Sequence, residues 1–401
     1  MQLDNGLTLI AETMESACSI ALGFFVRTGS RDETEEVSGV SHFLEHMMFK
    51  GTEKRSALDV NLEFDRMGAQ YNAFTSEENT VYYAAVLPEF QSRVLALWSD
   101  LMRPCLRQED FDTEKGVICE EIAMYKDLPH FEVVDRCRKL HFNAHGCGNS
   151  VLGTVESIEA LQQQQMADYF NRRYSPDNIV LACAGKINWD SLVRQTECLC
   201  GGWESARATR DLKEFGGTGD QDGSQIQQVV RQHLCLMIAA PPAQSELRHA
   251  ATVLASVIGD DTGSRFYWAL VDTALADSVD LDYDPMDGIG VYYSYVSCDP
   301  KDNDRIIDIV RNSLNAIRKN GVTDQELSAA KNKITSSVTL QGELPIGRLV
   351  PLGFGWTYRN EYRPLAEEIQ TIQNLTHDDI RKVLDAYPLD KITIQGVGPR
   401  N

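Results

Sequence analysis

Three residues near the N-terminus have the types and the spacing that could hold and use a metal ion. His42 and His46 stand four positions apart, and Glu45 comes just before the second histidine. Residues four apart lie on one face of a helix, so both imidazoles could bind a single ion. Two such nitrogen ligands are typical of a tetrahedral zinc site, where Glu45 could act as general base on water. The order H-x-x-E-H therefore predicts metal-dependent hydrolysis, and a pair of partly exposed helix histidines is the plainer alternative.

A catalytic zinc site also needs a third protein ligand and one open position. Glu114 and Glu121 are seven residues apart in a segment of helical spacing, so they share a face two turns apart. Glu120 points about 100° away and would face solvent or a cation. One shared-face carboxylate could bind zinc while the other accepts a hydrogen bond from a ligand imidazole. Spacing alone leaves open which carboxylate does which, and a plain helix-face charge is the alternative for Glu114.

A second histidine pair, His141 and His145, has the same spacing but no glutamate between its members. It lies beside glycines at a predicted helix end. We therefore interpret this pair as structural or as part of the surface.

The elements that would position these residues form two halves of similar α+β style. A chain of 401 residues suits two domains of roughly 200 residues each. We expect a first domain at 1–205, a linker at 206–225 that includes a Gly/Asp-rich stretch, and a second domain at 226–401 without the metal motif. The similar size of the halves suggests a duplicated domain.

Apolar periodicity predicts strands and helices in both halves. The expected strands are Leu7–Ala11, Ile20–Arg27, a run within Tyr71–Leu87, Ile179–Ala184, Gln228–Ala239, Gly288–Cys298 and Ile392–Val397. The expected helices of the second half are Leu247–Ile258, Asp304–Lys319 and Asp324–Thr339.

Composition narrows the classes of partner. A formal net charge of −21 argues against nucleic acid or an anionic membrane as partner and favours cationic substrates, although acidity also serves solubility. No stretch approaches the roughly 20 apolar residues of a membrane span. Ten scattered cysteines, with Cys198 and Cys200 as the closest pair, predict reduced thiols. We expect a cytoplasmic location, with the mitochondrial matrix or the periplasm open if a targeting segment has been removed.

Five segments carry a resemblance to a known family. They are SHFLEHMMFKGT, GAQYNAFTSEENTVYY, EKGVICEEIAMYKDLP, VLGTVESI and YSPDNIVLACAG, and together they cover most of the first half. They resemble the M16 family of metallopeptidases, the group of pitrilysin, insulysin and the mitochondrial processing peptidase. The resemblance implies an α+β fold of two similar α/β-sandwich domains of the LuxS/MPP-like metallohydrolase type, each with a mainly antiparallel sheet packed by helices.

The resemblance also implies a site and an activity. One Zn²⁺ per chain would be held by His42, His46 and Glu121, with Glu45 as catalytic base and Glu114 in support. The activity would be zinc-dependent endopeptidase cleavage of peptides or unfolded protein segments.

The same resemblance implies a substrate strand. In the family, the run corresponding to Tyr71–Thr75 is an edge strand that accepts an extended peptide by strand addition. Asn72, Ala73 and Phe74 would then line the scissile bond. An ordinary half-buried strand is the alternative for these three residues.

The second half departs from the family pattern. Where relatives carry an arginine and, seven residues later, a tyrosine that help bind substrate, this chain has about Val271 and Asp277. Arg265 is a weak candidate for a substituted contact, and a salt-bridged or surface arginine is the plainer interpretation. A chain of this length would supply half of the family's four-domain chamber, so we expect a homodimer or a heterodimer with a related M16 subunit. Three hypotheses follow: a self-sufficient peptidase, a zinc-bearing subunit that needs an Arg/Tyr-bearing sister, and an inactive structural or peptide-binding homologue.

Overall fold

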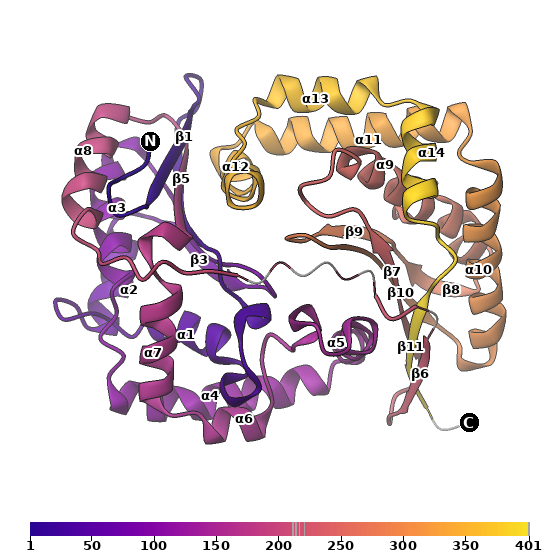
Figure 1. The fold of residues 1–401 in the computed structure, drawn as a ribbon, viewed down its shortest axis with the longest axis horizontal. Helices are drawn as coiled ribbons and strands as arrows, with labels where there is room; N and C mark the ends of the chain where they lie inside the picture. Colours follow the sequence, from indigo (N-terminus) through magenta and orange to yellow (C-terminus); the bar gives the residue numbers. More distant parts are fainter. Residues whose placement is uncertain (211, 213–214, 216, 220, 400–401) are drawn as a thin grey trace. The chain divides into compact units, whose positions relative to one another are not determined.

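The chain forms two compact units, each built from segments that are not contiguous in sequence. The structure is a computed structural model that describes residues 1–210, 212, 215, 217–219 and 221–399. Unit 1 comprises Met1–Ala123, Asn149–Asp211 and Leu340–Arg363, and unit 2 comprises Met124–Gly148, Leu212–Thr339 and Pro364–Asn401. Figure 1 shows the helices and strands of both units.

Unit 1 is organised around a five-stranded mixed sheet. Its strands are β1 (Thr8–Thr13), β2 (Ile20–Val26), β3 (Gln70–Thr75), β4 (Thr80–Val86) and β5 (Ile179–Gly185). The order is β1-β5-β2-β4-β3, in which β1 and β5 are parallel and the other pairs are antiparallel. The inner strands β2 and β5 are buried along their whole length, which explains their continuous apolar runs. The strand β3 lies at one edge.

Both faces of the unit 1 sheet are covered by helices. Seven helices of the described residues cover one face: α1 (Val40–Met48), α2 (Ala57–Arg66), α3 (Gln91–Leu101), α4 (Gln108–Lys126), α6 (Val155–Ala160), α7 (Gln163–Arg173) and α8 (Trp189–Cys200). They build the larger core with alternate residues of β2, among them Leu22 and Phe24. The other residues of β2, Ala21 and Phe25, pack against α12 (Pro345–Arg359).

Unit 2 repeats this plan. Its strands are β6 (Gln221–Ile226), β7 (Gln232–Ala240), β8 (Ala276–Val279), β9 (Asp282–Pro285), β10 (Gly290–Cys298) and β11 (Thr393–Gly398). The order is β6-β11-β7-β10-β8, with β9 also paired to β10, and β6 and β11 form the parallel pair. One outer parallel pair followed by antiparallel neighbours is the arrangement of unit 1, which supports the duplication expected from the sequence.

The helices of unit 2 also cover two faces. One core contains residues of α9 (Arg248–Gly259), α10 (Asn303–Asn320), α11 (Asp324–Gly342), α13 (Leu365–Asn374) and α14 (His377–Ala386). The other face of β7 packs against α5 (Pro129–Phe142) through Cys137 and Phe142. Both 19-residue helices, α4 and α11, are followed by a helix that begins at a proline, α5 and α12.

Short helical turns complete the chain. They are the 3-10 segments Ser30–Asp32, Glu35–Val37, Pro88–Phe90, Gly146–Gly148, Pro176–Asn178 and Pro300–Asp302, and the π-helix Tyr267–Val271. In the described part of the chain, no helix is both long enough and apolar enough to cross a bilayer.

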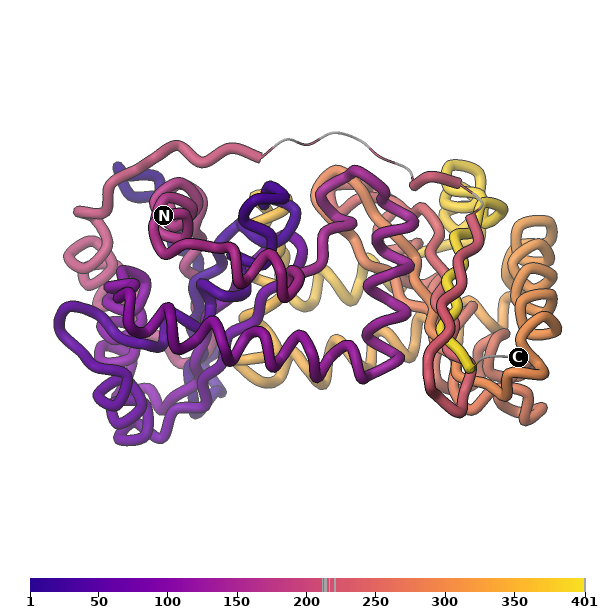
Figure 2. Tube along the Cα trace, turned by 90° about the horizontal axis from the view of Figure 1, so that it is seen from below, coloured from indigo at the N-terminus to yellow at the C-terminus, as the bar shows by residue number. Residues whose placement is uncertain are grey.

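The compact units differ from the domains expected from the sequence, 1–205 and 226–401, because each unit contains one segment from the other range. Residues 124–148 belong to unit 2 because α5 packs on its sheet, and residues 340–363 belong to unit 1 because α12 packs on the other. The expected linker 206–225 lies partly outside the described residues, at 211, 213–214, 216 and 220. Its last residues form β6, which lies beside β11, as Figures 1 and 2 show. This polar segment can form a strand because backbone pairing needs no apolar side chains.

Candidate metal centre

The helix α1 carries the histidine pair, and its start is fixed by a buried carboxylate. The helix begins after Gly39, whose φ of 89° is a left-handed conformation that favours glycine. Glu33 accepts hydrogen bonds from the backbone N–H groups of Gly39 and Ser41 at 2.7 and 2.8 Å. Burial raises the pKa of Glu33 to about 7, an effect that these hydrogen bonds oppose. This carboxylate satisfies N–H groups that the first turn of a helix leaves unpaired.

Packing of α1 against α4 brings the histidines opposite the acidic segment. Phe43 of α1 stacks on Phe111 of α4, with ring centroids 4.7 Å apart and planes inclined by 13°. Ile118 and Ile122 of α4 are buried in the same core. Because these contacts fix both helices, His42 and His46 of α1 and Glu121 of α4 project into the space between the two helices.

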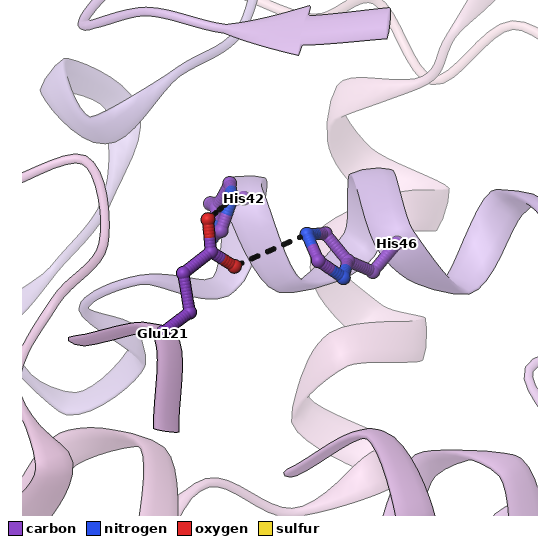
Figure 3. A group of neighbouring side chains, drawn as sticks. All are labelled: His42, His46 and Glu121. Atoms are coloured by element: carbon purple, nitrogen blue, oxygen red, sulfur yellow. Dashed lines mark ion pairs between the residues drawn. The ribbon is translucent and has the colours of Figure 1, made fainter. Parts of the chain in front are cut away.

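Three side chains meet in that space. His42 Nε2 lies 3.8 Å from Glu121 Oε1, and His46 Nε2 lies 3.5 Å from Glu121 Oε2. Figure 3 shows the Glu121 carboxylate pointing between the two imidazoles. One ligand atom from each residue lies within 4.8 Å of the other two. Among the described residues, this is the group of histidine, cysteine and acidic side chains that could hold a metal ion.

This donor set fits zinc. Zinc bonds to imidazole nitrogen and carboxylate oxygen are about 2.0–2.2 Å long, which places tetrahedral ligands about 3.4 Å apart. The two nitrogen-to-oxygen distances of 3.5 and 3.8 Å are close to that spacing. Burial, with a smaller effect of His46, lowers the pKa of His42 to about 3, so this imidazole is neutral, as a metal ligand must be. Two nitrogens and one oxygen leave the fourth position of a catalytic zinc site.

A second carboxylate orients His46. The Nδ1 atom of His46 donates to Glu114 Oε1 at 2.9 Å, and Lys50 forms an ion pair with the other oxygen of Glu114. Burial alone would raise the pKa of Glu114, but the hydrogen bonds from His46 and Lys50 outweigh it and lower that pKa. Burial alone would lower the pKa of His46, but Glu114 and the neighbouring carboxylates raise it. Glu114 therefore contacts the imidazole nitrogen of His46 that faces away from Glu121, and its supporting role stays a prediction. The sequence did not indicate Lys50.

Glu45 lies on α1 one turn from His42 and is held by β3. Its Oε2 atom accepts a hydrogen bond from Thr75 Oγ1 at 2.6 Å. Burial raises the pKa of Glu45, and the Thr75 hydrogen bond opposes that effect. Nothing in the sequence pattern singled out Thr75, because its contact with Glu45 depends on the packing of α1 against the sheet.

The predicted substrate residues lie on the edge strand β3 but on two faces of the sheet. Ala73 is buried in the core shared with α1, whereas Asn72 is exposed and Phe74 is half-buried. The Phe74 ring lies 6.4 Å from that of Phe354 on α12. Asn72 Oδ1 accepts a hydrogen bond from Ala73 N–H at 2.9 Å. The edge position agrees with the expected strand, and the substrate role of the three residues stays a prediction.

The remaining predicted positions lie in unit 2 and make ordinary contacts. Arg265 forms a bidentate ion pair with Glu326, with distances of 2.7 and 2.9 Å, as the plainer interpretation expected. Asp277, expected from the sequence at the tyrosine position of the family, pairs with Arg231. Val271 ends the π-helix.

The second histidine pair makes structural contacts within unit 2. His141 is buried, and its Nδ1 lies 2.9 Å from Thr393 Oγ1 on β11. His145 stacks on Phe215, and its Nδ1 accepts from Cys147 N–H. Neither histidine belongs to the metal-compatible group found in the described part of the chain.

Comparison with known families finds two matches that follow one another along the chain. The family described as "Insulinase (Peptidase family M16)" matches residues 8–155, the range that contains the candidate metal centre. The family described as "Peptidase M16 inactive domain" matches residues 160–334.

Similar proteins are found over nearly the whole length. An uncharacterized zinc protease of Streptomyces coelicolor is 31% identical over 409 residues, covering 99% of this chain and 88% of the relative. The uncharacterized zinc protease YmxG of Bacillus subtilis is 32% identical over 343 residues, covering 84% and 83%. A protease from Helicobacter pylori has a similar fold, with a TM-score of 0.93 at 21% identity and coverage of 100% and 98%. A structure from Pseudomonas fluorescens titled as a peptidase M16 inactive domain also scores 0.93, at 16% identity and coverage of 100% and 97%.

Proposed function

Because the chain belongs to peptidase family M16, we propose that it is a zinc-dependent endopeptidase that cleaves peptides and unfolded protein segments. In this proposal His42, His46 and Glu121 hold one zinc ion and Glu45 is the general base. The observation that carries it is the convergence within 4.8 Å of one ligand atom each from His42, His46 and Glu121. Glu45 lies on the helix that carries the two histidines. The zinc protease names of the curated relatives support the choice of metal.

The chemistry divides between the metal and the side chains. Zinc bound at this site would polarise the scissile carbonyl and make water acidic enough to attack near neutral pH. Glu45 would take the proton from the attacking water and pass it to the leaving amine. Glu114 would hold His46 through Nδ1, so that Nε2 stays directed at the metal position.

The open edge of β3 would hold the substrate. Ser76 N–H donates to Asn79 O at the turn between β3 and β4, so the backbone groups of alternate residues, Ala73 and Thr75 among them, point away from β4. An extended peptide that displaces the Asn72 side chain from Ala73 N–H could pair with these groups, with little dependence on its own side chains. A folded protein offers few such strands, which favours peptides and unfolded segments. The net charge of −21 favours cationic substrates.

A second candidate is a zinc-bearing subunit that works with a related M16 sister subunit. The observation that favours it is Asp277, which pairs with Arg231 and accepts from Ser297 Oγ at 3.2 Å. A carboxylate in these contacts offers no phenol to a substrate, and this is the position where relatives carry tyrosine. In either case we propose that the active form is a dimer, because one chain supplies two of the four domains of longer relatives.

The experiment is hydrolysis of a quenched cationic peptide library by the purified chain, with and without a zinc chelator. We expect chelator-sensitive turnover that Glu45→Gln lowers by at least about 100-fold while zinc stays bound at one ion per chain. The exposed carboxylate variant Glu53→Gln should keep full turnover. One bound zinc without turnover would favour the two-subunit candidate, and a wild-type chain that binds no zinc would reject both.

A further inference from the structure

Thr75 links the strand that would hold substrate to the residue that would act as base. It is the last residue of β3, and its hydroxyl donates to Glu45 Oε2 at 2.6 Å. The acceptor is a carboxylate, so this is a charge-assisted hydrogen bond when Glu45 is ionised. A hydroxyl at this distance fixes the direction of one carboxylate oxygen and therefore constrains the other.

The register of β3 explains how Thr75 can contact Glu45 with its side chain while its backbone stays available at the open edge. Side chains alternate along a strand, so Thr75 points to the same face as Ala73, which is buried in the core with Phe43 and Leu44 of α1. The backbone groups of Thr75 belong to the alternate set that points away from β4. The side chain of Thr75 therefore faces the base while its backbone faces the open edge.

We propose that Thr75 is a positioning residue that sets the orientation of the Glu45 carboxylate relative to a peptide paired with β3. This inference rests on the proposed function. The hydrogen bond holds Oε2, which leaves Oε1 to receive the proton of the attacking water. Strand addition and base orientation then depend on the same stretch of backbone, so a peptide aligned on β3 is also aligned with the base.

The size of the expected rate loss follows from the geometry of proton transfer. A general base must lie within about 2.6–3.2 Å of the proton donor, and a misplacement of about 1 Å costs about 100-fold in rate. Without the Thr75 hydroxyl, the Glu45 side chain can rotate away from its working direction. The effect should appear in kcat, because the backbone groups of β3 that bind the peptide are unchanged.

The test compares Thr75→Val, which keeps the shape and removes the donor, with Thr75→Ser, which keeps the donor. We expect Thr75→Val to lower kcat by about 10- to 100-fold with KM within about 2-fold. Thr75→Ser should restore kcat to within about 3-fold of wild type, and zinc content should stay at one ion per chain in both variants. Thr13→Val, at the exposed last residue of β1, is the matched control and should be unchanged.

A binding measurement separates positioning from damage to the strand. In the inactive Glu45→Gln background, the Kd of a cationic peptide should be the same with Thr75 and with Thr75→Val. A large rise in Kd, or equal losses of kcat in the Val and Ser variants, would overturn the inference and point to a packing role for Thr75.

The inference can also be tested if the wild-type chain shows no turnover, an outcome that counts against the proposed function and not against Thr75. Crystal structures of zinc-loaded wild type and Thr75→Val would then be compared. A Glu45 carboxylate that turns away only in the valine variant supports the inference, and an unmoved carboxylate rejects it.

Discussion

His46 Nδ1 lies 2.9 Å from Glu114 Oε1, while the other nitrogen of the same ring lies 3.5 Å from Glu121 Oε2. The imidazole is therefore held between two carboxylates of one helix, seven residues apart. Because Glu114 accepts from Nδ1, the tautomer of His46 leaves the lone pair of Nε2 free for a metal. Lys50 compensates the negative charge of Glu114, which keeps this buried carboxylate ionised.

We predict that Glu114→Gln weakens zinc binding by about 10- to 100-fold. The amide can still contact Nδ1, but it no longer carries the charge that raises the basicity of the imidazole. Competition between the protein and a fluorescent zinc chelator measures the change. Glu120→Gln, an exposed carboxylate on the same helix, is the matched control, and equal zinc affinities for the two variants would contradict the role of Glu114.

We predict that Arg210→Met destabilises unit 1 by about 1.5–3 kcal/mol, because the buried Asp32 carboxylate loses one of its two arginine partners. Arg210 contacts Asp32 through Nε and Nη2 at 3.0 and 2.6 Å, and both side chains are at most 4% exposed. Arg173 pairs with the same carboxylate. Urea unfolding followed by tryptophan fluorescence measures the loss. The exposed neighbour Arg207, replaced by Met, should change stability by less than about 0.5 kcal/mol.

We predict that Leu349→Ala lowers the stability of unit 1 by about 2–5 kcal/mol, although residue 349 lies far along the chain from the metal-binding segment. Leu349 is fully buried in the core that α12 forms with Phe25 and Val81. Thermal release of zinc to an indicator dye reports on unit 1, and it should occur at lower temperature in this variant. Leu340→Ala, at a position 66% exposed, serves as control; a shift of equal size there would count against the packing argument.

We predict that His141 makes unit 2 sensitive to mild acid. Burial, with a smaller effect of Arg138, lowers the pKa of His141 to about 4 from its ordinary value of 6.5. The unfolded chain therefore binds a proton at a higher pH than the folded chain does. The stabilising contribution is fully present above about pH 6.5 and is lost as the pH falls toward 4, by up to about 3 kcal/mol. Urea unfolding at about pH 7 and about pH 5 should show a smaller difference between the two pH values in His141→Gln than in wild type.

Local patterns in the sequence predicted most of the candidate site. The spacing of His42, Glu45 and His46 follows from helix geometry, and the seven-residue spacing identified both carboxylates of α4. Their division of roles was implied by family resemblance and stays a prediction; in the structure Glu121 lies between the two Nε2 atoms. Thr75 and Lys50 could not be found in this way, because their contacts depend on how α1 packs against β3 and α4.

The sequence predicted many of the strands and helices, but not which of the two compact units each helix would join. Apolar patterns predicted β2, β5, β7, β10 and β11, whose central positions demand buried side chains. They missed β6, which has a polar sequence and is held by backbone pairing with β11. They also gave no sign that α5 and α12 pack on sheets of the opposite half, because amphipathicity shows that a helix has an apolar face and not which sheet it covers.

The position of α12 in unit 1 has a consequence for the order of events during synthesis. The sheet that carries the candidate substrate strand is complete by residue 185, but one of its faces keeps Ala21, Phe25 and Val81 uncovered until Pro345–Arg359 has been made. Ribosomes add about 5–20 residues per second, so this apolar face waits roughly ten seconds or more for its cover. The unit that carries the candidate metal centre therefore matures late, and a nascent chain that stops before residue 345 leaves a surface for chaperones to bind.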